Sequence, residues 1–127
     1  MNGRALIIAI DEVVEDGDAM VTITLDWQGG LVQGAAVGSD SPRERPRLVG
    51  EAALRALESL ASKPLSFELL AIASTDLGDH RVALAQVRAD PSGSVLVGSA
   101  LVDEENGSMA AARAVMDALN RRLSVLL

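Results

Sequence analysis

The sequence predicts an α+β fold made of duplicated βββα units, with a largely antiparallel sheet and two helices packed on one side of it. Three observations support this prediction: three strand-like segments precede a helical segment twice, the two halves match at a near-constant spacing, and turn-forming residues separate the strands. Ala9-Ile10 recurs as Ala71-Ile72, and Gly34 recurs as Gly98 at nearly the same spacing. We therefore expect a single domain, 1–127, with two repeats at about 4–63 and 66–127.

The strands are predicted from short β-rich runs that end at turn residues. The six runs are Leu6–Val14, Ala19–Trp27, Leu31–Val37, Phe67–Ser74, Arg81–Ala89 and Ser94–Val102. Gly17 and Gly78 stand at equivalent hairpins, where glycine permits the positive φ of a tight turn. Each half therefore reads as a three-stranded meander.

Two amphipathic helices are expected, from about Pro46 to Ser62 and from about Met109 to Leu123. Ser41-Pro42-Arg43-Glu44 has the form of a capping box before the first helix. Small inward residues allow close helix packing, and they are Ala52, Ala53, Ala111, Ala112 and Ala118. The expected core residues are Ile8, Ile10, Ile23, Leu25, Leu57, Leu70, Ile72, Val87, Val115 and Leu119.

Several of the predicted strands are apolar on both faces, whereas only Ala19–Trp27 alternates cleanly. Two helices can cover one face of a six-stranded sheet, so a second apolar face is left for a partner. Val82, Leu84 and Leu126 are the expected interface residues. A homodimer, or a larger protein assembly, is the simplest way to bury such a face.

Composition excludes many classes of function. The formal net charge is −7 and the only aromatic residues are Trp27 and Phe67, a combination that disfavours nucleic acid and anionic membranes as partners. The absence of cysteine and the single histidine leave little basis for a metal site, and no cofactor is expected. The short apolar run Ala5–Ile10 fits neither a signal peptide nor a membrane span, so we expect a cytoplasmic location.

Three groups of residues are candidates for chemistry. His80 stands beside Asp79 in a hairpin, where decoration of the turn explains it better than acid–base catalysis. The acidic run of Asp103, Glu104 and Glu105 lacks the spacing of a calcium loop and suits the start of a helix. No catalytic, cofactor or metal site is therefore predicted, and we expect that the chain is not an enzyme.

An alternating run of arginines precedes the first helix and is the most chemical feature of the sequence. Arg43, Arg45 and Arg47 could bind a carboxylate or phosphate together with the helix N-terminus. These three residues are the predicted ligand-binding site.

A resemblance to a known family follows from the two βββα units, from Val97-Gly98-Ser99-Ala100 and from Ala118-Leu119-Asn120-Arg121 near the end. The pattern resembles the regulatory dimerisation domain of 2-isopropylmalate synthase, here as a stand-alone chain. The resemblance implies dimerisation and an effector site in the loops between the third strand and the helix of each unit. In this sequence those loops, 38–43 and 103–108, are charged, and so they depart from the glycine-rich, uncharged pattern of that family.

Three functions remain open from the sequence. The first is a non-catalytic homo-oligomeric interaction or accessory module. The second is a sensor domain that binds a small anionic metabolite at the strand-to-helix loops. The third is a hotdog-type enzyme acting on acyl thioesters, although that fold wraps its sheet around one early helix and this sequence predicts two late ones.

Overall fold

The computed structural model describes residues 4–62, 64–103 and 107–126. Within these ranges the structure has six strands and three helices in sequence order. They are β1 (Ala5–Glu15), β2 (Asp18–Trp27), β3 (Gly30–Ser39), α1 (Arg45–Glu58), β4 (Ser66–Leu77), β5 (His80–Asp90), β6 (Ser94–Leu101), α2 (Ser108–Asn120) and the short α3 (Leu123–Leu126). The α+β fold with βββα units is thus confirmed, and the first helix begins slightly earlier and ends one turn earlier than expected.

The strands form two antiparallel three-stranded sheets and not the single six-stranded sheet that we expected. β1, β2 and β3 form the first sheet, and β4, β5 and β6 form the second sheet. α1 lies between β3 and β4 in the chain and packs against both strands. The helix therefore stands between them, and β3 and β4 do not pair. The apolar area is therefore distributed over two sheets, each with an inner and an outer face.

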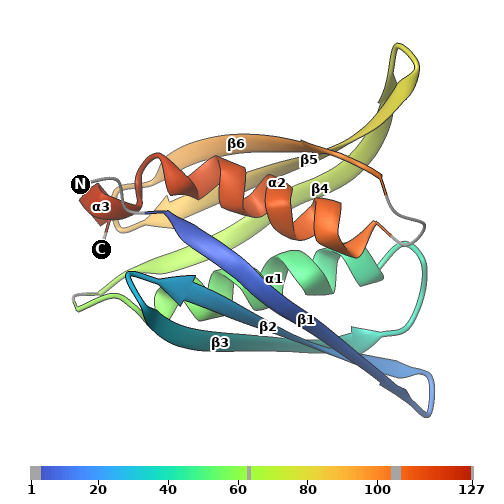
Figure 1. Ribbon diagram of the computed structural model, residues 1–127, viewed down its shortest axis with the longest axis horizontal. Helices are drawn as coiled ribbons and strands as arrows, with labels where there is room; N and C mark the ends of the chain where they lie inside the picture. Colours follow the sequence, from blue (N-terminus) through green and yellow to red (C-terminus); the bar gives the residue numbers. More distant parts are fainter. Residues whose placement is uncertain (1–3, 63, 104–106, 127) are drawn as a thin grey trace.

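Both helices lie between the two sheets, as Figure 1 shows. α1 packs on β2 and β3 of its own unit and reaches β4 of the other sheet. In the same way, α2 packs on β5 and β6 and reaches β1, and the two helices also contact each other. Each helix thus joins the inner faces of both sheets.

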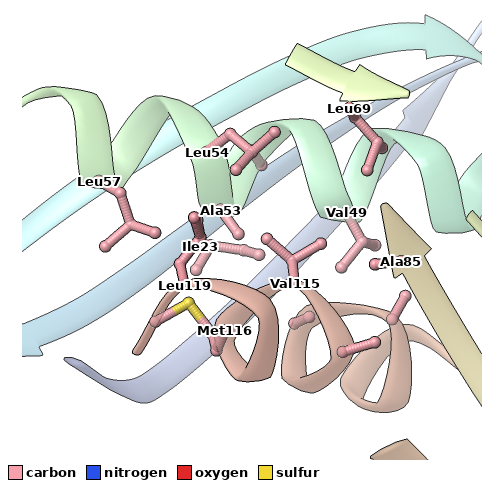
Figure 2. Packing of buried hydrophobic residues seen from close by; sticks show 14 of the residues in the cluster. Ile23, Val49, Ala53, Leu54, Leu57, Leu69, Ala85, Val115, Met116 and Leu119 are labelled. Atoms are coloured by element: carbon pink, nitrogen blue, oxygen red, sulfur yellow. The ribbon is translucent and has the colours of Figure 1, made fainter. Parts of the chain in front are cut away.

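The core is aliphatic and is centred on the contact between the helices. Val49 and Leu57 of α1 face Val115 and Leu119 of α2, and Ile23 of β2 closes the layer from the first sheet (Figure 2). All five side chains are fully buried. The alanines that were expected to face inward are buried as well, and they are Ala52, Ala53, Ala111, Ala112 and Ala118. Their small size lets the two helices and the sheets come close together.

Two glycines mark the closest approach of a strand to a helix. A Cβ atom built on Gly34 of β3 would lie 2.3 Å from the carbonyl oxygen of Ala52 and 2.2 Å from the backbone nitrogen of Ala56. On Gly98 of β6 the same atom would meet the carbonyl oxygen of Ala114 at 2.2 Å and the backbone nitrogen of Ala118 at 2.3 Å. Because backbone atoms cannot move aside as a flexible side chain can, each helix can reach its strand only where that strand has no side chain.

The end of each helix is bonded to the start of the first strand of the other unit. Glu58 of α1 accepts a hydrogen bond from the backbone N–H of Phe67 at the start of β4, at 2.6 Å. Asn120 of α2 accepts one from the N–H of Ala5 at the start of β1, at 2.9 Å. These two bonds satisfy the backbone N–H groups at the starts of β4 and β1. Each bond also links the helix of one unit to the sheet of the other unit.

One of the predicted core residues is exposed. Ile8 is 54% exposed on β1, because the register of β1 against β2 shifts between Ile7 and Ala9 and turns its side chain outward. β4 has the same irregularity between Leu69 and Ala71, and Leu70 is only half-buried. Ile10 and Ile72 are also partly buried, whereas the remaining predicted core residues are fully buried. A bulge moves every residue beyond it to the other face of the strand. The pattern of residues in these two runs does not indicate where the bulge lies.

We expect Gly34→Ala to lower the free energy of unfolding by about 1–3 kcal/mol or more, because the added methyl group overlaps the backbone of α1. Gly30→Ala is the matched control, since a Cβ there would lie 3.6 Å from its nearest neighbour, the carbonyl oxygen of Trp27. Urea unfolding measures both changes. Equal midpoints for the two variants would contradict the close approach.

Candidate functional site

The N-terminal ends of α1 and α2 lie together at one end of the molecule. Arg45 begins α1 and Ser108 begins α2, and both donate hydrogen bonds to the same carboxylate oxygen, Oε1 of Glu12 on β1. The first residues of the two helices therefore meet at one carboxylate. The sequence predicted the ligand site on the loop before α1.

The first half of this region is an ion cluster around Arg45. Its Nη1 lies 2.7 Å from Glu12 Oε1, and its Nη2 lies 2.6 Å from Asp40 Oδ1. The side chains of Arg45 and Glu12 are about one-fifth exposed, so the pair is largely shielded from solvent. Hydrogen bonds to Asp40 and Glu12 raise the pKa of Arg45 above its ordinary value. The guanidinium thus stays charged and is already occupied by two carboxylates.

The second half of this region is an open cavity of about 510 Å³. Two guanidinium groups line it, those of Arg43 before α1 and Arg81 on β5, and Gly107 lies at its rim before α2. Its apolar wall consists of Pro42, Pro46, Ile72, Ala83, Val102 and Ala111. A cavity with cationic groups beside apolar walls fits a small carboxylate with an aliphatic part.

The cluster and the cavity occupy matching places in the two units. At the spacing that relates Ala9-Ile10 to Ala71-Ile72, Glu12 corresponds to Ser74 and Arg45 corresponds to Gly107. Both Ser74 and Gly107 line the cavity. The second unit is hollow where the first unit places a carboxylate and a guanidinium.

The structure separates the three arginines of the predicted ligand site. Arg43 lines the cavity, Arg45 belongs to the ion cluster, and Arg47 pairs with Glu51 one helical turn along α1 at 3.4 Å. The sequence analysis missed Arg81, which joins Arg43 from a strand of the other unit. It also missed Glu12. No local pattern relates either residue to the loop before α1.

The predicted interface residues lie apart from this region. Val82 and Leu84 are on the outer face of β5, where Leu84 is 39% exposed. Leu126 is in α3, and its side chain lies outside the described part of the structure.

The other candidates for chemistry lie elsewhere along the chain. His80 is exposed at the start of β5, and Asp103 follows the end of β6. Glu104 and Glu105 lie outside the described residues. Among the residues that the structure does describe, no group of three histidine, aspartate or glutamate side chains could hold a metal ion.

Comparison with known proteins gives no relative from which a function could be inferred: no family model matches the chain, and neither does any curated protein. In the three described ranges, no helix is both long enough and apolar enough to cross a membrane.

We expect Glu12→Gln to lower the free energy of unfolding by about 1–3 kcal/mol, because Arg45 then loses a charged partner in a shielded place. Glu51→Gln is the matched control on the exposed Arg47 pair and should cost less than about 0.5 kcal/mol. Chemical denaturation of both variants at neutral pH provides the comparison. If both losses are equally small, the cluster around Arg45 does not stabilise the junction of the two units.

Proposed function

We propose that this protein is a non-catalytic, self-associating interaction module. The observation that carries this proposal is the apolar outer face of the second sheet. Leu84 lies between Ala73 and Ser99 on this face, and Val82 lies beside Leu101 in the next row. A row further along, Val97 is 59% exposed next to Gln86.

The first sheet supplies an internal comparison. At the positions that match Val82 and Leu84, β2 has Met20 and Thr22. Thr22 and Thr24 form a polar strip along the middle of the outer face of the first sheet. The two units have the same order of elements, so the fold does not require the second outer face to be apolar. The first sheet also exposes Met20 and Val37 on its outer face, so the difference is confined to the middle strand, where Leu84 stands in place of Thr22. We take this leucine as support for a specific contact.

An apolar sheet face with an ion pair near one end has the form of a protein interface. Arg88 lies on the same face of β5 as Leu84 and pairs with Glu68 of β4. Interfaces commonly have an apolar centre and a polar rim. A second copy is the simplest partner, because the same face is then buried on both chains by a twofold axis.

The proposal that the chain is not an enzyme rests on how its reactive groups are placed. His80 is exposed at a hairpin, and its side chain makes no hydrogen bond or ion pair within residues 4–62, 64–103 and 107–126. The acidic and basic groups at the helix starts are either paired with one another or line the cavity without a base. Catalysis requires several such groups to converge. The cytoplasmic location stays a prediction.

We further propose that the two βββα units are copies of one unit. The equivalent strand bulges, the paired glycine contacts of Gly34 and Gly98, and the bonds from Glu58 and Asn120 to the opposite unit support this interpretation.

A second candidate function is favoured by the cavity between the helix starts. Arg43 and Arg81 supply positive charge beside an apolar wall, as a sensor of small anionic metabolites would require. Arg43 has no ion pair with any described residue, so its guanidinium is available to a ligand. Arg81 is only loosely held, at 3.7 Å from the exposed Asp76.

For the proposed module, we expect sedimentation at low micromolar concentration to show a self-associated protein. Val82→Asp combined with Leu84→Asp should raise the dissociation constant by at least about tenfold, because the charged groups lose water in the contact. Met20→Asp with Thr22→Asp is the matched control on the first sheet. A wild-type monomer would refute self-association, and equal effects of the two pairs would refute the second sheet as the interface.

For the sensor, we expect butyrate to raise the melting temperature of the wild-type protein more than acetate does, because its longer chain contacts the apolar wall. Butylamine, which has a similar length and the opposite charge, should give no such shift. Arg43→Ala with Arg81→Ala should abolish the effect of butyrate, whereas Arg47→Ala should retain it. An undiminished shift in the double variant would refute the cavity as the site.

A further inference from the structure

The two sheets have four edge strands, β1, β3, β4 and β6, and the fold leaves one of them unprotected. Three of the four have a feature that discourages pairing with another chain. β1 contains Asp11, Glu12 and Glu15, and β4 contains Glu68 and Asp76. Charged residues on an edge strand oppose the addition of a further strand.

The edge of β6 is protected in another way. This strand has no charged residue, but Asp117 of α2 reaches over its edge and accepts a hydrogen bond from the backbone N–H of Ser99 at 2.9 Å. The carboxylate occupies a backbone group that a neighbouring strand would need. It also adds a negative charge at the edge.

The edge of β3 has neither protection. The strand is ten residues long and contains no charged residue and no proline. A two-residue turn joins Trp27 to Gly30, so the N–H and C=O groups of Leu31, Gln33, Ala35 and Val37 point away from β2. In the described part of the chain, no side chain bonds to these groups. Arg55 stands where α2 has Asp117, and it donates instead to the carbonyl oxygen of Phe67.

The helix beside this edge carries charges in a self-complementary order. Arg47, Glu51, Arg55 and Glu58 lie along the partly exposed side of α1. This side of α1 lies between two edge strands, because α1 packs on β3 and because Arg55 and Glu58 bond to Phe67 of β4. The outer edge of β3 is therefore next to it, as the outer edge of β6 is next to Asp117 of α2. From the N-terminus the order of charge is basic, acidic, basic, acidic, and from the C-terminus it is acidic, basic, acidic, basic. Two copies of the helix that lie antiparallel therefore place opposite charges next to each other.

We infer that β3 and the charged side of α1 form a second contact between copies of this chain, in which β3 pairs antiparallel with β3 of the other copy. A twofold axis beside the strand places Glu51 opposite Arg55, and Arg47 opposite Glu58, of the two copies. The sheet then continues through six strands. Leu31 and Val37, both 65% exposed, become cross-strand neighbours when Gly34 lies on the axis.

This inference rests on the proposed self-association and adds a second surface to it. An isologous contact through the face of the second sheet and another through the edge of the first sheet use different sides of the chain. Two such contacts build a closed assembly, a tetramer in the simplest case, when their axes intersect, and an open chain when they do not. The assembly is therefore larger than a dimer.

The test is the mass of the assembly, measured by sedimentation for the full chain. Glu51→Arg places like charges opposite each other across the axis and should weaken this contact by at least about tenfold, so that the assembly falls to a dimer. Arg113→Glu is the matched control, because it reverses a charge at the equivalent place on α2. That variant should keep the wild-type mass.

Ala35→Pro tests the strand pairing itself, since it removes an outward N–H that makes no bond within the described chain. We expect the same dimer, with a far-ultraviolet spectrum like that of the wild type. Wild-type mass in both the Glu51 and the Ala35 variants overturns the second contact and leaves the proposed function intact. The wild-type protein could also be a dimer that dissociates only when Val82 and Leu84 are substituted. That result refutes the pairing of β3 with β3 and leaves the interface on the second sheet intact. A monomeric wild-type protein overturns both proposals.

Discussion

The rest of the structure depends on the contact between the glycines of the third strands and the backbones of the helices. Gly34 and Gly98 let α1 and α2 lie directly against β3 and β6. At that depth, each helix also reaches the sheet of the other unit and the other helix. Side chains at these two positions would hold the layers apart and open voids in a core in which nearly half of the buried apolar residues are alanines.

Helices that lie between two sheets bury the inner faces and leave both outer faces to solvent. The burial of alternate residues along β2 and β5 follows from this arrangement. The first sheet has Thr22 and Thr24 along the middle of its outer face, and the second has Leu84 and Gln86 at the matching places. The proposed interface lies where the two sheets diverge.

The same divergence appears wherever the two units differ in charge. Glu12 and Arg45 close one junction between strand and helix, whereas Ser74 and Gly107 leave the matching junction hollow. Arg55 turns to β4, whereas Asp117 turns to β6 and covers its edge. The two units thus have a similar backbone but different sites. One has an ion cluster where the other has a cavity, and one has a free strand edge where the other has an edge covered by a carboxylate. Each proposal for function depends on one of these side-chain differences.

The sequence alone determined the class of fold, the order of the elements and six of the ten core residues that it predicted, because the periodicity of apolar residues and the turn residues act locally along the chain. It could not determine that the strands divide into two sheets, since pairing depends on which segments meet in space. Ile8 was assigned to the core because a bulge leaves no local pattern. Arg81 joins Arg43 from the other unit, and Arg45 is already paired with Glu12 of another strand. Only the tertiary structure decided which charges meet, because their distance in space is unrelated to their distance in sequence.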